Sequence, residues 1–395
     1  MAQVVDVAVK KTKVFLHIGH GKTGTSAVQS SLAIASDDLF SYGINYPIHP
    51  SLRDRLAQLE ITSGNWSPNP ERSLIEELLS LAKNNKTNSK IILSSESLFW
   101  ETPELIQKKS QWDNHIDLHI IMAVREIEEM LSSEYQQRVK RHGDSMPLEQ
   151  FIRARKFTSS HHAKAAEIID LMTHSGISHT IINYSKHKQN ISRVIFQSIG
   201  AEKLYPESKM NEVIINRSLS QKELEIMLII NKLYYSKLPQ ISTIISDTLI
   251  KNLPNIESQQ CRIASQQLEK VYSKNSQFLE TINSRLSKNE QLSTYRRELT
   301  ASKSAEQAKK VFDEEKLSIQ LIADTLQKLL ALEYKKPLSN EKVDAIISLS
   351  QSENITKNVE IELLEVAKEN RPQGQALTRL ISRAKKALKK LRSPL

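Results

Sequence analysis

The sequence predicts an α/β fold: a three-layer, mainly parallel sheet flanked by helices, followed by an all-helical C-terminal extension. Short β-branched and aliphatic runs alternate with helical patterns in the first half of the chain, and the strand signal ends near residue 219. Only 9 Gly and 12 Pro occur in 395 residues, which favours helices joined by short loops. Continuous apolar strands that alternate with helices are typical of a sheet covered on both faces.

Five apolar runs are the expected strands: Val14–Ile18, Ile44–Tyr46, Lys90–Ser94, Leu118–Val124 and His179–Asn183. Between them, Ser73–Lys83 and Glu126–Arg141 have clear helical periodicity. Ligands of such folds bind at the carboxyl ends of the strands. The residues that follow these strands are therefore the first candidates for a functional site.

Helical patterns dominate the rest of the chain, at Gln221–Leu233, Gln259–Leu286, Leu317–Leu332 and Val343–Leu349. We expect an N-terminal lead at 1–13, a main domain at 14–299 and a helical extension at 300–395. The extension ends in an amphipathic basic helix, residues 376–392. This helix suits an anionic membrane surface, and it equally suits a helix that packs its apolar stripe on its own domain.

The composition of the chain bears on the kind of partner that it binds and on the compartment in which it works. The net charge of +10 and the pI near 9.3 suit an anionic partner such as a nucleotide, an acidic glycan, nucleic acid or a lipid surface. The single cysteine, Cys261, cannot form an intramolecular disulfide. Neither a signal peptide nor an apolar run of about 18 residues is visible. We expect a cytoplasmic protein, with peripheral attachment to the inner membrane as an alternative.

The strongest motif is the segment 17–26, HIGHGKTGTS, which lies between the first expected strand and a helical pattern. A glycine-containing turn lets backbone N–H groups point at an anion, and the helix N-terminus adds partial positive charge. One lysine and several hydroxyls complete the motif. The residues expected to bind a phosphate-like group are Gly21, Lys22, Thr23, Gly24, Thr25 and Ser26.

The position of the lysine distinguishes this loop from a nucleoside-triphosphate loop, in which lysine directly follows the second glycine. Here Thr25 has that place and Lys22 lies inside the loop. The order Gly-x-x-Lys-Thr-Gly-Thr-Ser resembles the 5′-phosphosulfate loop of the sulfotransferases that use 3′-phosphoadenosine 5′-phosphosulfate (PAPS). The resemblance covers about residues 13 to 290, and it implies a P-loop-like sulfotransferase fold with PAPS as the donor.

A second element of that family binds the donor's 3′-phosphate. It consists of an arginine at a strand end and a serine eight residues later, and Arg125 and Ser133 match this spacing. Glu126-Ile127 stands where the family usually has Asn-Pro or Asp-Pro. The resemblance therefore implies that Arg125 and Ser133 hold the 3′-phosphate.

Sulfuryl transfer needs a cation at the leaving oxygen and a base at the acceptor hydroxyl. Lys22 is the expected cation. Glu96, at the end of the third expected strand, is the expected base, with His20 as the rival; alternatively, Glu96 caps the next helix or pairs with a lysine. No His or Asp group has metal-ligand spacing, so we expect no metal.

These features predict a PAPS-dependent sulfotransferase acting on a hydroxyl of a carbohydrate or glycolipid, with no nucleic-acid partner. Two other classes stay open. A P-loop kinase or NTPase would need a lysine after the second glycine and a strand-end aspartate for magnesium. A non-catalytic protein that binds anions or membranes would need neither a base nor a 3′-phosphate pair, so the presence of Lys22, Arg125 and Ser133 argues against this class.

Overall fold

The structure is a computed structural model, and it describes residues 11–57, 64–85, 90–210, 217–236, 238–256, 261–295, 317–319, 321–326, 340–351, 357–371 and 375–392. The chain divides into two compact units, Met1–Ile322 and Ala323–Leu395. The expected domain boundary near residue 300 lies outside the described residues.

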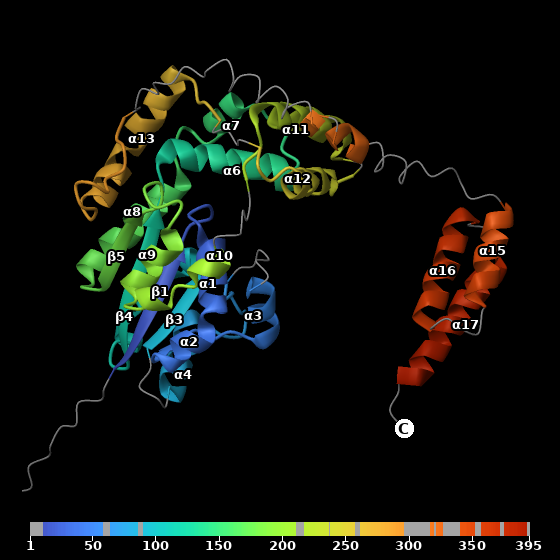
Figure 1. Ribbon diagram of the computed structural model, residues 1–395, viewed down its shortest axis with the longest axis horizontal. Coiled ribbons are helices and arrows are strands. Elements are labelled where there is room, and N and C mark those ends of the chain that lie inside the picture. The colour runs from blue at the N-terminus through green and yellow to red at the C-terminus, as the bar shows by residue number, and fades with distance from the viewer. Residues whose placement is uncertain are drawn as a thin grey trace, which may run out of the picture. The chain divides into compact units, whose positions relative to one another are not determined.

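A five-stranded sheet forms the centre of the first unit (Figure 1). Its strands are β1 (Thr12–Gly19), β2 (Ile44–Asn45), β3 (Lys90–Ser95), β4 (Ile116–Val124) and β5 (Ser178–Asn183), in the order β2-β3-β1-β4-β5. Every pair is parallel. All five predicted strands are confirmed. β1 lies at the centre of the sheet, and the connection from β3 to β4 passes from one side of β1 to the other.

Helices cover both faces of the sheet. On one face, α1 (Thr25–Ile34) and α9 (Ile191–Ser198) pack over a core that includes Phe15, Ile92 and Ile121. On the other face, α5 (Leu98–Gln107) contacts β1 and β3, and α8 (Ser160–His174) contacts α5. The predicted α/β architecture is therefore present.

Shorter elements complete the part of the unit around the sheet: α2 (Ser36–Ser41), α3 (Pro50–Ala57), α4 (Leu74–Asn84), the 3₁₀ turns η1 (Lys109–Gln111) and η2 (Glu202–Leu204), and α10 (Glu207–Met210). Ser73 and Glu76 form a capping box that starts α4, in agreement with the predicted helix from residue 73.

The remainder of the first unit is helical and is organised around α6 (Ile127–His142). It contains α7 (Leu148–Ala154), α11 (Gln221–Tyr234), α12 (Ile241–Asn252) and α13 (Ser265–Asn283); α7, α11 and α12 pack on α6, and α13 packs on α8. The helix predicted at 259–286 corresponds to α13, and its predicted start is wrong for the described residues 261–264, which precede the helix. There, Cys261 and Ile263 are buried, and the N–H of Cys261 donates to Ser132 Oγ at 2.7 Å, so this segment packs on α6.

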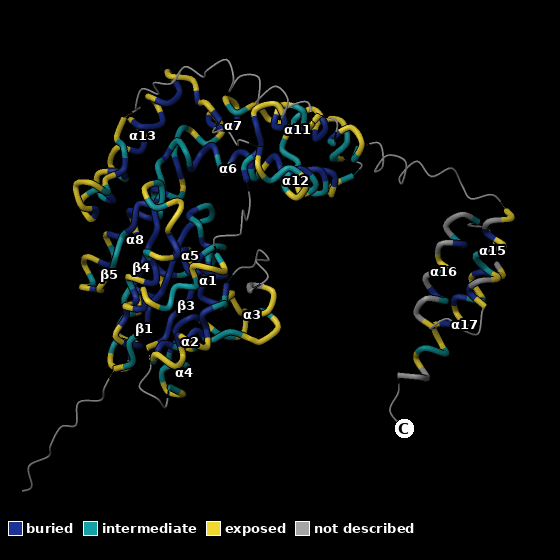
Figure 2. Tube along the Cα trace, viewed as in Figure 1, coloured by how far each residue is buried: buried dark blue, intermediate teal, exposed yellow. Residues whose placement is uncertain are grey.

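The second unit contains α15 (Asn340–Ser350), α16 (Lys357–Asn370) and α17 (Gln375–Arg392). Leu377, Ile381 and Ala384 of α17 lie in the core of this unit. Figure 2 shows the same alternation of buried and exposed positions along α17. The apolar stripe of the basic helix is thus packed within its own unit, whereas its described basic residues are exposed: Arg379, Arg383, Lys385, Lys386 and Lys389.

In the described part of the chain, no helix is both long enough and apolar enough to cross a membrane.

Candidate active site

The loop between β1 and α1 has an unusual backbone. Lys22 and Gly24 both have φ of 77°. A Cβ on Gly24 would lie 2.7 Å from Cε2 of Tyr184, so only glycine fits this position without a shift. For Lys22, a left-handed conformation costs about 1 kcal/mol. Thr23 Oγ1 donates to the carbonyl oxygen of His20 at 2.8 Å and holds the turn closed.

The N-terminus of α1, which follows this loop, has no side-chain cap. Its first turn contains no acidic residue. The first N–H groups of a helix have no partner within the helix, and they favour an anion. Among the described residues, neither the Lys22 ammonium nor the Ser26 hydroxyl has a hydrogen-bond or ion-pair partner. Burial lowers the pKa of Lys22, and the nearby charge of Glu96 opposes this shift.

Glu96, directly after β3, lies at the same loop. Its Oε1 accepts a hydrogen bond from Thr25 Oγ1 at 2.6 Å, and its Oε2 is 3.5 Å from the point where a Cβ on Gly21 would stand. The next helix, α5, has Ser97 as its N-cap residue and no side-chain cap, so the side chain of Glu96 does not cap it. The structure thus places Glu96 beside Gly21, Thr25 and Lys22, with one carboxylate oxygen occupied.

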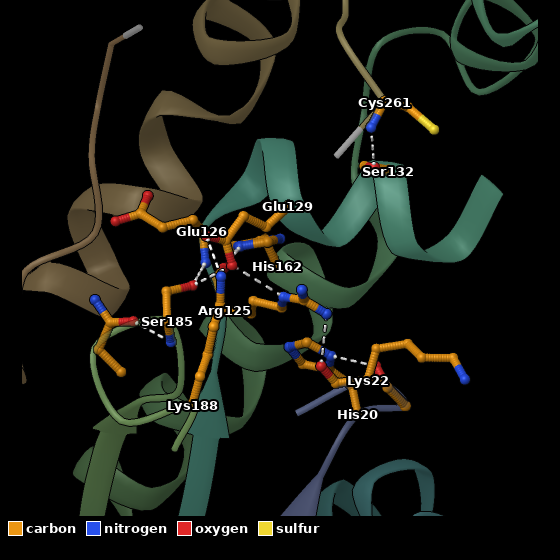
Figure 3. Close-up of polar contacts among 12 residues, drawn as sticks. His20, Lys22, Arg125, Glu126, Glu129, Ser132, His162, Ser185, Lys188 and Cys261 are labelled. Carbon is orange, nitrogen blue, oxygen red and sulfur yellow. Dashed lines mark hydrogen bonds and ion pairs between the residues drawn. The ribbon is translucent and has the colours of Figure 1, made fainter. Parts of the chain in front are cut away.

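Arg125, at the end of β4, forms a hydrogen bond to the loop between β1 and α1 (Figure 3). Its Nη1 donates to the carbonyl oxygen of Lys22 at 2.9 Å, and its Cζ lies 5.2 Å from the centroid of the Tyr184 ring. Its own carbonyl accepts a hydrogen bond from His162 Nε2 at 2.7 Å. These contacts bring the predicted 3′-phosphate residue to the edge of the predicted 5′-phosphosulfate loop.

The guanidinium of Arg125 also faces Glu129, an acid that is not among the predicted site residues. Glu129 Oε2 accepts from Arg125 Nε at 3.2 Å and from Ser185 Oγ at 2.9 Å, while Glu129 Oε1 accepts from Lys188 Nζ at 2.6 Å (Figure 3). Burial opposes ionisation of Glu129, but Lys188, Arg125 and Ser185 together hold its pKa below the ordinary value. The carboxylate of Glu129 therefore already occupies the guanidinium of Arg125, the residue predicted to bind the 3′-phosphate.

Ser133 lies one turn beyond Glu129 on the same face of α6. It is half-buried, and its hydroxyl has no partner in the described part of the chain. The preceding Ser132 is committed to the backbone of Cys261. The guanidinium of Arg125 thus pairs with Glu129, and no hydrogen bond joins Arg125 to Ser133 in the part of the chain that the structure describes.

His20, the rival base, is buried among aromatic rings. Its Nδ1 lies 3.1 Å from the carbonyl oxygen of Gly21; a carbonyl can only accept, so Nδ1 carries the proton and Nε2 the lone pair. Its ring centroid lies 5.0 Å from that of His161 and 5.6 Å from that of Phe99. Burial above all, and then the nearby histidines, place the pKa of His20 well below its usual value, so the ring is neutral at pH 7. Within the described residues, no cluster of His, Cys, Asp and Glu could hold a metal ion.

Lys140, on α6, is a further cation close to Lys22. It is 7% exposed, and its Nζ lies 3.4 Å from the carbonyl oxygen of Arg217. Burial, followed by the charges of Lys22, Arg141 and Arg217, lowers the pKa of Lys140 to about 7. The helical periodicity of 126–141 predicted the helix that carries Lys140, but its proximity to Lys22 depends on packing.

The segment around Arg217 has a structural role in the described residues. Arg217 and Glu223 form a buried ion pair at 2.7 Å, and Glu223 also closes the capping box of α11 with Ser220. Arg217 further donates to the carbonyl oxygen of Leu253 at 2.7 Å, so it ties the start of α11 to the end of α12.

A scan against protein-family models finds no match for this chain, and a search of curated proteins finds no relative.

Proposed function

We propose that the protein transfers a sulfuryl group from PAPS to a hydroxyl acceptor, and that its sheet belongs to the P-loop-like sulfotransferase type. The observation that carries this proposal is the loop after β1. Its lysine has no partner among the described residues, and it adjoins the uncapped N-terminus of α1 and the carboxylate of Glu96. This combination offers a cation and helix N–H groups to a phosphosulfate, together with a proton acceptor.

In the proposed reaction, the acceptor oxygen forms a bond to sulfur while the bond from sulfur to the bridging phosphate oxygen breaks. Lys22 neutralises the bridging oxygen as negative charge develops there. Glu96 Oε2 takes the acceptor proton, since Thr25 occupies Oε1. The second product is adenosine 3′,5′-bisphosphate.

Arg125 and Ser133 are the proposed partners of the donor's 3′-phosphate; Arg125 follows β4, and Ser133 lies on α6 one turn beyond Glu129. To reach Arg125, this phosphate must displace or join the carboxylate of Glu129. Ser185 and Lys188 then become further candidates for donor binding, because they share that carboxylate. The acceptor is proposed to be a carbohydrate or glycolipid hydroxyl.

Isothermal calorimetry tests the donor assignment. We expect the wild-type protein to bind adenosine 3′,5′-bisphosphate without a metal ion and Lys22→Ala to bind it more weakly. A matched control is Lys108→Ala, because this exposed lysine pairs only with Glu104 on α5 among the described residues. Tight binding of magnesium-ATP with no binding of adenosine bisphosphate would replace the proposal with a nucleotide kinase or NTPase. Transfer itself is then assayed with labelled PAPS and a panel of acceptors.

A further inference from the structure

The outer side of α17 in the second unit is strongly basic. The helix has the sequence QALTRLISRAKKALKKLR, with seven lysine and arginine residues and no acidic residue. Leu377, Ile381 and Ala384 follow one another at i, i+4 and i+7 and are 3%, 8% and 2% exposed, because they pack in the core of the unit. This apolar stripe is therefore not available to a partner.

The cations lie opposite the apolar stripe. Arg379, Arg383 and Lys386 have the same spacing, displaced by two residues along the helix, and two residues turn an α-helix by about 200°. All three are exposed. We call these residues, together with the exposed Lys385 and Lys389 beside them, the basic face. Burial of the apolar stripe thus turns the basic face to solvent.

Little of the charge on the basic face is neutralised within the unit. The Lys385 ammonium pairs with Glu365 of α16 at 2.7 Å, but these side chains are 57% and 48% exposed, so solvent screens the pair. Among the described residues, the other four cations of the face have neither a hydrogen bond nor an ion pair. Like charges at i, i+4 on a helix repel one another. An anionic partner would relieve this repulsion.

The other exposed side chains of α17 favour a partner that is recognised by charge alone. In the described part of the helix, the exposed uncharged polar side chains are those of Thr378 and Ser382, and the helix contains no aromatic residue. Single-stranded nucleic acids are usually bound through bases stacked on aromatic rings. A bilayer with anionic head groups needs only closely spaced cations, and clusters of about four to eight lysine and arginine residues on a helix are typical of proteins that bind it.

We propose that the basic face of α17 docks the protein on an anionic lipid bilayer without inserting into it. The cations pair with the phosphates and carboxylates of the head groups, while the apolar stripe stays in the core of the unit. An ordinary amphipathic membrane helix differs, because it buries its apolar face among the acyl chains. The attachment is therefore electrostatic, and salt reverses it. This docking does not depend on the proposed sulfuryl transfer.

Flotation of the full-length protein with lipid vesicles tests the docking. Vesicles of phosphatidylcholine alone are compared with vesicles in which about a third of the lipid is phosphatidylserine. We expect binding only to the second kind, and release in about 1 M sodium chloride, where the Debye length falls to about 3 Å. Two results overturn the proposal: the protein does not float with the anionic vesicles, or it stays bound at this salt concentration, which would show that apolar residues insert.

Charge variants locate the surface. Combining Arg379→Gln, Arg383→Gln and Lys386→Gln should weaken vesicle binding about a hundredfold, at about fivefold for each cation. The fold should be retained because all three positions are exposed, and circular dichroism checks the helix content. Arg379→Lys combined with Arg383→Lys keeps the charge and should bind within about twofold of the wild type.

The matched control removes the same charge from exposed positions on three other helices, α4, α11 and α12, and it should bind like the wild type; it combines Lys83→Gln, Lys232→Gln and Lys251→Gln. Equal weakening in the two triple variants would overturn the proposal, because the total charge of the protein would then drive binding. The proposal also fails if a DNA duplex binds more tightly than the anionic vesicles at the same salt concentration and loses its affinity in the α17 variant. The basic face would then be a nucleic-acid surface.

Discussion

Glu129→Gln should strengthen donor binding while it weakens the unliganded fold. In the free protein, the Glu129 carboxylate is shared by Arg125 at 3.2 Å, Lys188 at 2.6 Å and Ser185 at 2.9 Å. A phosphate that uses Arg125 has to compete with this carboxylate. Glutamine keeps the size of the side chain but removes the charge, so both cations become available to the ligand.

The magnitude follows from the burial of these groups. The side chains of Arg125 and Glu129 are 16% and 19% exposed, whereas Lys188 is 42% exposed. Solvent screens the Lys188 pair, so the two pairs together contribute about 1 to 2 kcal/mol. We therefore expect the affinity for adenosine 3′,5′-bisphosphate to rise about tenfold and the free energy of unfolding to fall by a similar 1 to 2 kcal/mol.

Calorimetry and urea unfolding measure these two quantities on the same preparation. The matched control is Glu149→Gln, which removes an acid from an exposed i,i+4 pair with Arg153 on α7. It should change both quantities by less than about 0.5 kcal/mol. An unchanged or lower affinity in Glu129→Gln would show that Glu129 positions Arg125 for the ligand or that the phosphate does not bind there.

Four other outcomes are expected. Lys22→Ala should retain the fold and lower turnover by about two to three orders of magnitude; turnover within threefold of wild type in a PAPS assay would remove its role at the leaving oxygen. Glu96→Gln should lower turnover by about two orders of magnitude, while the donor affinity measured by calorimetry stays the same. Normal turnover would instead indicate that His20 is the base, and His20→Asn would test that assignment. EDTA should leave transfer unchanged, since Lys22 is the cation assigned to the leaving oxygen, and a loss restored by magnesium would contradict this. Lys140 has a folded-state pKa of about 7, below the value of about 10.4 in an unfolded chain, so the unfolded state binds more protons between these values. Lys140 should therefore add up to about 4 kcal/mol to the unfolding free energy, measured in urea, from about pH 7 to pH 10. Lys140→Met should make the rise smaller, and an equal slope in both proteins would contradict the lowered pKa.

The sequence was sufficient to predict the fold class and the loop, because both depend on short-range patterns. Each strand is a continuous apolar run, and the sheet buries such runs on both faces. The loop residues 17–26 are adjacent in the chain, so strand, turn and helix N-terminus could be recognised together. The strand-end positions of Glu96 and Arg125 likewise followed from the rule that carboxyl ends of parallel strands share one edge.

Tertiary structure alone decided which side chains meet at this edge. The i,i+4 spacing of Arg125 and Glu129 is visible in the sequence, but Ser185 and Lys188 join them from the loop after β5. Similarly, the neighbouring rings of Trp100 and His161 come from α5 and α8, and the charge of Lys22 acts on Lys140 only through the packing of α6 in this unit. Residue patterns determine which face of an element is buried, whereas contacts between distant polar side chains depend on how the elements pack, and no local pattern contains that information.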